Sequence, residues 1–308
     1  MSAVAIPAEQ LRHRAESLVR RYADMRAGEI LSFDQATRAE DAALPPTQAA
    51  VLPALRMLQF VEHDAQILAK AWQAQSDRSG QFDPLDWPDE PQDFGLSRTS
   101  SLSFPACPPA LGLYAVLPDA TWVRAMAQAG VPTLQLRFKS SDSSAIGQQV
   151  RAAVRAVADT NALLFINDHW RQAIDEGAYG VHLGQEDLAD TPLETLRAAG
   201  LRLGLSTHGY AEMLRADAAA PSYLALGAVF PTTLKRMVTL PQGTARLRAY
   251  ARLMKHHSLV AIGGIDAARI PEVLRSGVGS VAVVRAIVGE ADPVASAKML
   301  MKLVAVHR

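Results

Sequence analysis

The 308-residue sequence has little cysteine, no excess of either charge and no long apolar run. Its one cysteine, Cys107, cannot form an internal disulfide, which is typical of a reducing cytoplasm. The 31 Lys and Arg residues equal the 31 Asp and Glu residues in number, so no overall field attracts nucleic acid or an anionic membrane. No apolar stretch approaches the roughly 20 residues that cross a bilayer, and the start of the chain lacks a secretory signal. We therefore expect a cytoplasmic protein without a nucleic-acid or membrane partner.

Residues 1–75 contain little that resembles a strand and are predicted to form a helical N-terminal region. Apolar residues spaced three and four apart mark helical stripes at Leu11, Leu18 and Tyr22, and at Leu58, Val61, Ala65, Leu68 and Trp72. Residues 76–110 are rich in Ser, Asp, Gly and Pro, and proline disfavours helix at the residue before it. This segment is therefore predicted to be an extended linker. Because residues 1–75 carry no recognisable chemistry, we expect them to be dispensable for activity.

Residues 111–308 alternate between short apolar runs and helical segments. The eight runs centre on Tyr114, Leu136, Leu164, Leu183, Leu203, Leu226, Ala261 and Val283. Glycines at 130, 177, 200 and 277 follow helical segments, where a left-handed cap residue is favoured. Eight strands, each followed by a helix, in roughly 200 residues are typical of an α/β fold of the (β/α)8 TIM-barrel type. An open doubly wound sheet is the alternative, but it normally has a Gly-x-Gly-x-x-Gly turn, and none follows Tyr114.

Cationic and amide side chains stand at the predicted end of the second strand. Arg137 and Lys139 are two residues apart, so both side chains are predicted to point to the same side of that strand. Burying two cations together is costly unless an anion lies between them, although both could instead extend into solvent. Gln135 shares their face, and its amide suits the edge of a heterocyclic amine. The carboxyl ends of barrel strands are where functional groups collect, which favours a binding role.

Two carboxylates stand at the ends of adjacent strands. Asn167 and Asp168 end the third strand, and Asp187 follows the fourth. Mg²⁺ typically takes one or two carboxylates together with phosphate oxygens and water. An Asn-Asp pair alone could equally be a turn or a helix cap. The neighbouring cations and Asp187 favour a metal-bound pyrophosphate site.

Hydroxyls, a lysine and glycines follow the later strands. The loop Phe230-Pro-Thr-Thr-Leu-Lys235 could hold phosphate, and Gly263-Gly264 would let backbone amides approach a ligand. Ser206 could orient an anion or only satisfy the backbone, and no base or oxyanion hole favours it as a nucleophile. His182 is expected to be a buried, hydrogen-bonded histidine, whereas His208 lies nearer the rim and could act as an acid or base. A Schiff-base role for Lys235 would leave the two aspartates unexplained.

In this order and on this scaffold, the clusters resemble thiamine-phosphate synthase over about residues 111–305. The resemblance implies a transferase of thiamine biosynthesis. It would join 4-amino-2-methyl-5-(diphosphooxymethyl)pyrimidine to a thiazole phosphate and release pyrophosphate. The resemblance further implies small-molecule substrates, Mg²⁺ as the metal and association into a homo-oligomer.

The resemblance also implies roles for particular residues. The pyrimidine diphosphate would be held by Gln135, Leu136, Arg137, Phe138, Lys139, Asn167, Ser206 and Lys235. Mg²⁺ would be carried by Asp168 and Asp187. The thiazole phosphate would be held by Thr232, Thr233, Leu234, Gly264 and the backbone of Val284 and Arg285. Arg137, Lys139, Ser206 and Lys235 would be the catalytic residues, because they stabilise charge on the departing pyrophosphate.

Two positions depart from the family pattern, and two other functions compete. The family usually has Thr-x-Thr-Lys, but Leu234 replaces the second hydroxyl here, and Arg285 stands where the family usually has serine. Both changes affect the thiazole half of the site. A thiazole tautomerase resembles the synthase in fold but binds no pyrophosphate, which would leave the cations and aspartates without a role. The other alternative is a non-catalytic sensor of a phosphate ligand that acts through the helical N-terminal region, residues 1–75, here called the helical front.

Overall fold

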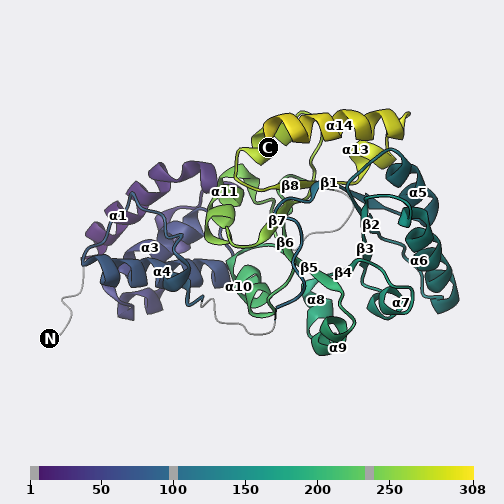
Figure 1. The fold of residues 1–308 in the computed structure, drawn as a ribbon. Coiled ribbons are helices and arrows are strands. Elements are labelled where there is room, and N and C mark those ends of the chain that lie inside the picture. Colours follow the sequence, from purple (N-terminus) through teal and green to yellow (C-terminus); the bar gives the residue numbers. More distant parts are fainter. Residues whose placement is uncertain (1–6, 97–102, 233–238) are drawn as a thin grey trace.

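The computed structural model describes residues 7–96, 103–232 and 239–308, and it contains a closed barrel of eight parallel strands (Figure 1). The strands are β1 (Gly112–Leu117), β2 (Thr133–Leu136), β3 (Leu163–Asn167), β4 (Gly180–Leu183), β5 (Arg202–Thr207), β6 (Tyr223–Leu226), β7 (Ser258–Ala261) and β8 (Ser280–Val283). Each strand pairs with the next, and β8 closes onto β1 with Leu113 opposite Val281. The predicted TIM barrel is therefore confirmed.

Helices follow each strand and surround the barrel. They are α5 (Ala120–Gln128), α6 (Ser143–Val157), α7 (Trp170–Asp175), α8 (Gln185–Leu188), α9 (Leu193–Ala198), α10 (Tyr210–Ala218), α11 (Gly243–Leu253), α12 (Ile270–Leu274), α13 (Arg285–Val288) and α14 (Pro293–His307). Asp119 and Asp142 cap α5 and α6 by accepting hydrogen bonds from backbone N–H groups of the first turn. The glycines at 130, 177, 200 and 277 have positive φ angles, as their positions after helical segments predicted.

Side chains alternate between two apolar layers along the strands. On β1, Leu113 and Leu117 pack in the layer beneath the helices, whereas Tyr114 points into the barrel. Phe165 and Tyr223 meet Tyr114 in the interior, with ring centroids 5.1–6.0 Å apart. A Cβ atom on Gly204 would lie 2.1 Å from the Tyr223 ring, so only glycine leaves space for that tyrosine. Three aromatic rings therefore fill the barrel below its mouth, which is the end where the strands have their carboxyl ends.

The N-terminal region is helical, as predicted. It contains α1 (Ala8–Arg21), η1 (Ala23–Met25), α2 (Phe33–Ala36), η2 (Ala39–Ala43), α3 (Pro46–Met57) and α4 (Glu62–Ser79), and η3 (Pro91–Phe94) follows it. The stripe expected from Leu58 to Trp72 does not lie on one helix, because the chain turns between α3 and α4. Val61 is consequently 46% exposed, whereas Ala65, Leu68 and Trp72 on α4 are buried. Helix α4 also continues through Ser79 into the predicted linker.

These N-terminal helices pack against one side of the barrel, next to α10 and α11 (Figure 1). Asp64 of α4 accepts a hydrogen bond of 2.8 Å from the backbone N–H of Ala211 in α10. Trp87 of the connecting segment donates to the Tyr210 hydroxyl at 3.0 Å. Buried side chains of the front and of the barrel form one continuous apolar cluster. In the described part of the chain, no helix is both long and apolar enough to span a membrane.

Candidate active site

The first predicted cations lie just beyond β2 rather than within it. The strand ends at Leu136, and the N–H of Arg137 bonds to the Leu117 carbonyl at 2.8 Å. The prediction that Arg137 and Lys139 share a strand face is therefore wrong, because alternation of side chains stops where the strand stops. Arg137 is half-buried, and its charge acts on both His182 and Asp168. Lys139 is exposed at the rim.

The other residues predicted around β2 differ in whether the side chain or only the backbone faces the mouth of the barrel. Gln135 points into the barrel and is 5% exposed. The Leu136 side chain is buried in the outer apolar layer, so only its backbone faces the end of the strand. Phe138 packs partly on the same layer, and its carbonyl contacts the His169 ring at 3.0 Å.

Asp168 and Asp187 form a carboxylate pair above β3 and β4. Asp168 has a positive φ of 63° and donates its N–H to the His182 carbonyl at 3.0 Å, which holds it at the strand end. Asp187 lies in α8, where its carboxylate accepts from the Gly184 N–H at 3.1 Å. Although Asp168 retains exposed surface, partial burial raises its pKa, and the negative charge of Asp187 raises it further. A cation between the two carboxylates would relieve this repulsion.

A chain of hydrogen bonds crosses the barrel interior and ends at Ser206. Gln135 Nε2 donates to Tyr114 Oη at 3.0 Å, and Tyr114 Oη lies 2.8 Å from Tyr223 Oη. Tyr223 Oη lies 2.7 Å from His182 Nδ1, and His182 Nε2 lies 2.8 Å from Ser206 Oγ. Only Ser206 is more than slightly exposed. The sequence pointed to Gln135 and Ser206, but the two tyrosines that connect them were missed.

The position of the single proton on the neutral His182 ring sets the direction of this chain. Burial, aided by the charge of Arg137, lowers the pKa of His182 to about 4, so the ring carries one proton at neutral pH. In the tautomer with its proton on Nε2, His182 accepts from Tyr223 at Nδ1 and donates to Ser206 Oγ. Tyr114, which accepts from Gln135, then donates to Tyr223. In this pattern the hydroxyl proton of Ser206 is directed to another acceptor.

His208 is tied to a local carboxylate at the rim. Its Nδ1 lies 2.7 Å from Glu212 Oε2, and its backbone N–H donates to the same oxygen at 2.8 Å. The interaction with His208 lowers the pKa of Glu212 despite partial burial of that carboxyl. His182 is buried and hydrogen-bonded, as expected from its place in a strand.

The turn after β7 packs closely against the loop after β6. A Cβ atom on Gly264, whose φ is +64°, would lie 2.5 Å from the Pro231 carbonyl, so this contact requires glycine. Thr232 follows Pro231 and is half-buried. Val284 follows β8, and Arg285 begins α13 with an exposed side chain. Thr233, Leu234 and Lys235 lie outside the described residues.

The residues at one end of the barrel therefore form two groups. Those that the structure brings around the mouth of β2 to β5 are Gln135, Arg137, Asn167, Asp168, Asp187 and Ser206. Asn167 belongs to this group because its side chain hydrogen-bonds to Asp168. Gly264, Thr232, Val284 and Arg285 follow β6 to β8 and form the second group. A carboxylate pair beside cations and hydroxyls suits a metal-bound polyphosphate.

Comparison with known proteins identifies the family of the chain. The model of the family described as thiamine monophosphate synthase matches residues 113–287. The chain is similar to a thiamine-phosphate synthase of Neisseria meningitidis serogroup A, with 49% identity over 63% of this chain and 94% of that protein. It is 52% identical to a thiamine-phosphate synthase of Escherichia coli O6:H1, over 61% of this chain and 90% of that protein. A solved thiamine phosphate pyrophosphorylase of Pyrococcus furiosus aligns with a TM-score of 0.58 and 30% identity, covering 64% of this chain and 96% of its own. The chain belongs to the thiamine monophosphate synthase family.

Proposed function

We propose that the mouth of the barrel carries out the thiamine-phosphate synthase reaction through a diphosphate held by Arg137, Ser206 and a metal ion on Asp168 and Asp187. The bond between the pyrimidine methylene carbon and the diphosphate oxygen breaks. The thiazole nitrogen then forms the new bond to that carbon, and pyrophosphate leaves with the electron pair. The single observation that carries this proposal is the repelling aspartate pair beside Arg137, because an anionic substrate fits there only with a cation.

Mg²⁺ is the metal that suits this pair. Two carboxylates that follow adjacent strands match its preference for oxygen ligands. Partial burial, followed by the charge of Asp187, raises the pKa of Asp168, and a cation beside both carboxylates would offset both effects. When bound, Mg²⁺ would supply charge neutralisation on the departing pyrophosphate.

The side chains of the chain would bind and orient the pyrimidine diphosphate. Arg137, Lys139 and Lys235 would neutralise diphosphate oxygens as negative charge builds on the leaving group. The Ser206 hydroxyl, directed outward by the chain from Gln135, would donate to one of those oxygens. Gln135 uses Nε2 inside the barrel, so its carbonyl oxygen is left to accept from the 4-amino group of the pyrimidine.

The second group of residues would hold the thiazole phosphate. Backbone amides at Gly264, Val284 and Arg285 and the hydroxyls of Thr232 and Thr233 are suited to phosphate oxygens. No protein nucleophile is required, because the electron-rich pyrimidine can carry the positive charge that forms on its methylene. Holding the thiazole nitrogen close and in line would supply much of the remaining rate enhancement.

Removing the metal is expected to stop turnover while the barrel stays folded. Pyrophosphate release with both substrates should fall to background in excess EDTA and return when Mg²⁺ is restored, because the diphosphate charge is no longer neutralised. The circular dichroism spectrum at the assay temperature should not change, since the core is apolar. Pyrophosphate release by the intact protein also separates the three functions, because a tautomerase releases none and a sensor only binds. Full activity in EDTA would contradict the proposed metal site.

Replacing Tyr223 by phenylalanine is expected to raise KM for the pyrimidine diphosphate. Without the Tyr223 hydroxyl, His182 can place its proton on either nitrogen, and the Ser206 hydroxyl is no longer held in one direction. Loss of one oriented hydrogen bond corresponds to a decrease in kcat/KM of roughly tenfold. The measurement is steady-state kinetics with each substrate varied in turn, and KM for the thiazole phosphate should stay unchanged.

Tyr210→Phe is the matched control for that substitution. Tyr210 is as buried as Tyr223, but it packs in the outer apolar layer, where its hydroxyl accepts a hydrogen bond from Trp87 at 3.0 Å. Both variants should lose comparable stability, about 1–3 kcal/mol for a buried partner left unpaired. If both also lose the same fraction of kcat/KM, the effect of Tyr223 is only structural.

A further inference from the structure

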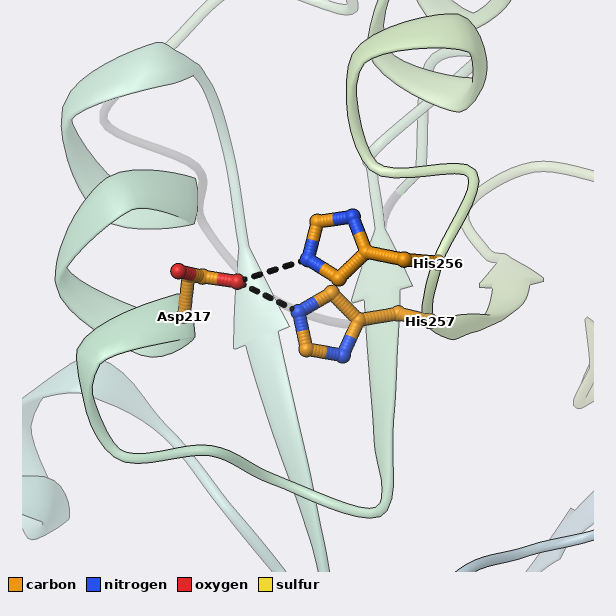
Figure 2. Close-up of side chains that lie close together, drawn as sticks. All are labelled: Asp217, His256 and His257. Atoms are coloured by element: carbon orange, nitrogen blue, oxygen red, sulfur yellow. Dashed lines mark hydrogen bonds and ion pairs between the residues drawn. The ribbon is translucent and has the colours of Figure 1, made fainter. Parts of the chain in front are cut away.

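Asp217, His256 and His257 form a cluster of metal-ligating side chains away from the mouth of the barrel. Figure 2 shows the two imidazole rings pointing toward the same carboxylate from a separate segment of the chain. His256 Nε2 lies 2.9 Å from Asp217 Oδ1, and His257 Nε2 lies 2.7 Å from the same oxygen. Within the described residues, this is the one cluster of at least three such side chains whose ligand atoms lie within 4.8 Å of one another.

The local structure explains why neighbouring histidines converge. His256 and His257 lie in the turn between α11 and β7, so their side chains are not forced to opposite sides as in a strand. Asp217 lies in the last turn of α10, which leads to the start of β6. The cluster therefore stands at the amino ends of β6 and β7, whereas Asp168 and Asp187 follow the carboxyl ends of their strands.

The two histidines of the cluster also line an open cavity. A cavity of about 570 Å³ is bordered by both histidines and by residues of the connecting segment, including Phe104 and Cys107. The side chains of His256, His257 and Asp217 are 25%, 10% and 17% exposed, respectively. These values leave the ligand atoms shielded but reachable from solvent. Space for a water molecule as a further ligand is therefore present.

We propose that Asp217, His256 and His257 bind a divalent transition-metal ion, with Zn²⁺ as the best match. Two imidazole nitrogens and one carboxylate oxygen, with one position left for water, form a ligand set that Zn²⁺ commonly takes. The histidine nitrogens disfavour Mg²⁺, which prefers oxygen ligands. On binding, each ring moves its proton from Nε2 to Nδ1, and the metal replaces both N–H hydrogen bonds to Asp217.

The required rearrangement is small. Ligands about 2.0–2.1 Å from a tetrahedral zinc ion lie about 3.3 Å from one another. The two nitrogen–oxygen distances of 2.7 and 2.9 Å would therefore lengthen by about half an ångström. Rotation of side chains in a turn and at a helix end can supply this change. The bound ion would join α10 to the turn before β7 and so stabilise the amino-terminal end of the barrel.

The test measures Zn²⁺ binding in a variant that lacks the proposed metal site at the mouth of the barrel. Isothermal titration of metal-free protein carrying Asp168→Asn and Asp187→Asn is expected to show one Zn²⁺ site per chain. Adding His256→Ala or Asp217→Asn should weaken binding by more than the about 10- to 100-fold typical of losing an outer-shell partner. Adding His307→Ala, which removes an exposed histidine of α14, should leave binding unchanged. Absence of saturable binding, or binding that survives His256→Ala, would overturn the proposal.

Thermal unfolding of the intact chain gives a second readout that does not depend on those variants folding. Zn²⁺ at a hundredfold excess over its dissociation constant should raise the unfolding midpoint by roughly 5 °C, and Mg²⁺ at that concentration should not. An equal shift with Mg²⁺, or no shift with Zn²⁺, would contradict the site. Pyrophosphate release by His256→Ala should match that of the unmodified chain. Failure of the zinc site is therefore distinguishable from failure of the proposed function.

Discussion

Arg137→Ala is expected to lower kcat/KM for the pyrimidine diphosphate by about 100- to 1,000-fold, the range seen when one stabilising donor is removed from an active site. Arg137 is the half-buried cation whose charge reaches both Asp168 and His182, so its loss leaves the diphosphate beside carboxylates with less compensation. Pyrophosphate release under single-turnover and steady-state conditions measures the effect. The unfolding midpoint should change little, because the side chain lies at the mouth and outside the apolar core.

Arg151→Ala is the matched control for this substitution. Arg151 is an exposed arginine of α6 that pairs with Glu176 at 2.7 Å, and a solvated surface ion pair of this kind contributes little to stability. Its replacement should leave kcat/KM unchanged. Arg137→Lys should recover part of the rate, since it keeps the charge but loses bidentate geometry. Turnover near the unmodified level in Arg137→Ala would remove Arg137 from the diphosphate site.

The barrel could be predicted because local signals in the sequence agree with the global fold. Apolar runs around Tyr114 and Val283 are short enough for strands, and glycines such as Gly130 mark the helix ends where a positive φ is needed. The prediction from apolar periodicity failed where the chain turns between two helices. The stripe through Leu58 and Trp72 was interrupted between α3 and α4, since apolar spacing alone does not reveal a turn between two helices.

The residues of the candidate site could be named from the sequence, but the connections among them could not. Asp168 and Asp187 could be placed together because both follow adjacent strands of a parallel barrel. The Tyr114–Tyr223–His182 chain joins β1, β6 and β4, so it exists only once the barrel closes and Gly204 leaves space for the Tyr223 ring. The strand alternation assumed for Arg137 and Lys139 failed because the length of β2 is set by pairing with its neighbours.

Deleting residues 1–79 is expected to prevent folding of the barrel, contrary to the dispensable role that the sequence suggested. Arg246 of α11 is 2% exposed and donates to the backbone carbonyls of Met25 at 2.7 Å and Leu58 at 2.8 Å. Its guanidinium also lies 3.6 Å from the centroid of the Phe60 ring. Removing residues 1–79 takes away these contacts and exposes apolar surface of α10 and α11, and the second loss is the larger because the freed guanidinium is then solvated. Recovery in the soluble fraction and urea unfolding measure the result.

The full-length variant Arg246→Met separates the two causes of this instability. Methionine keeps much of the side-chain volume and removes the charge, so it should be tolerated better than the truncation if lost apolar contacts dominate. Arg246 also donates to Gln242 Oε1 at 3.2 Å, and Gln242 N–H bonds to the Ala228 carbonyl, so Gln242 contacts the described start of the segment between β6 and α11. A truncated chain that did fold should therefore show a raised KM for the thiazole phosphate. Normal stability and normal KM after truncation would mean that the helical front supports neither the barrel nor this loop.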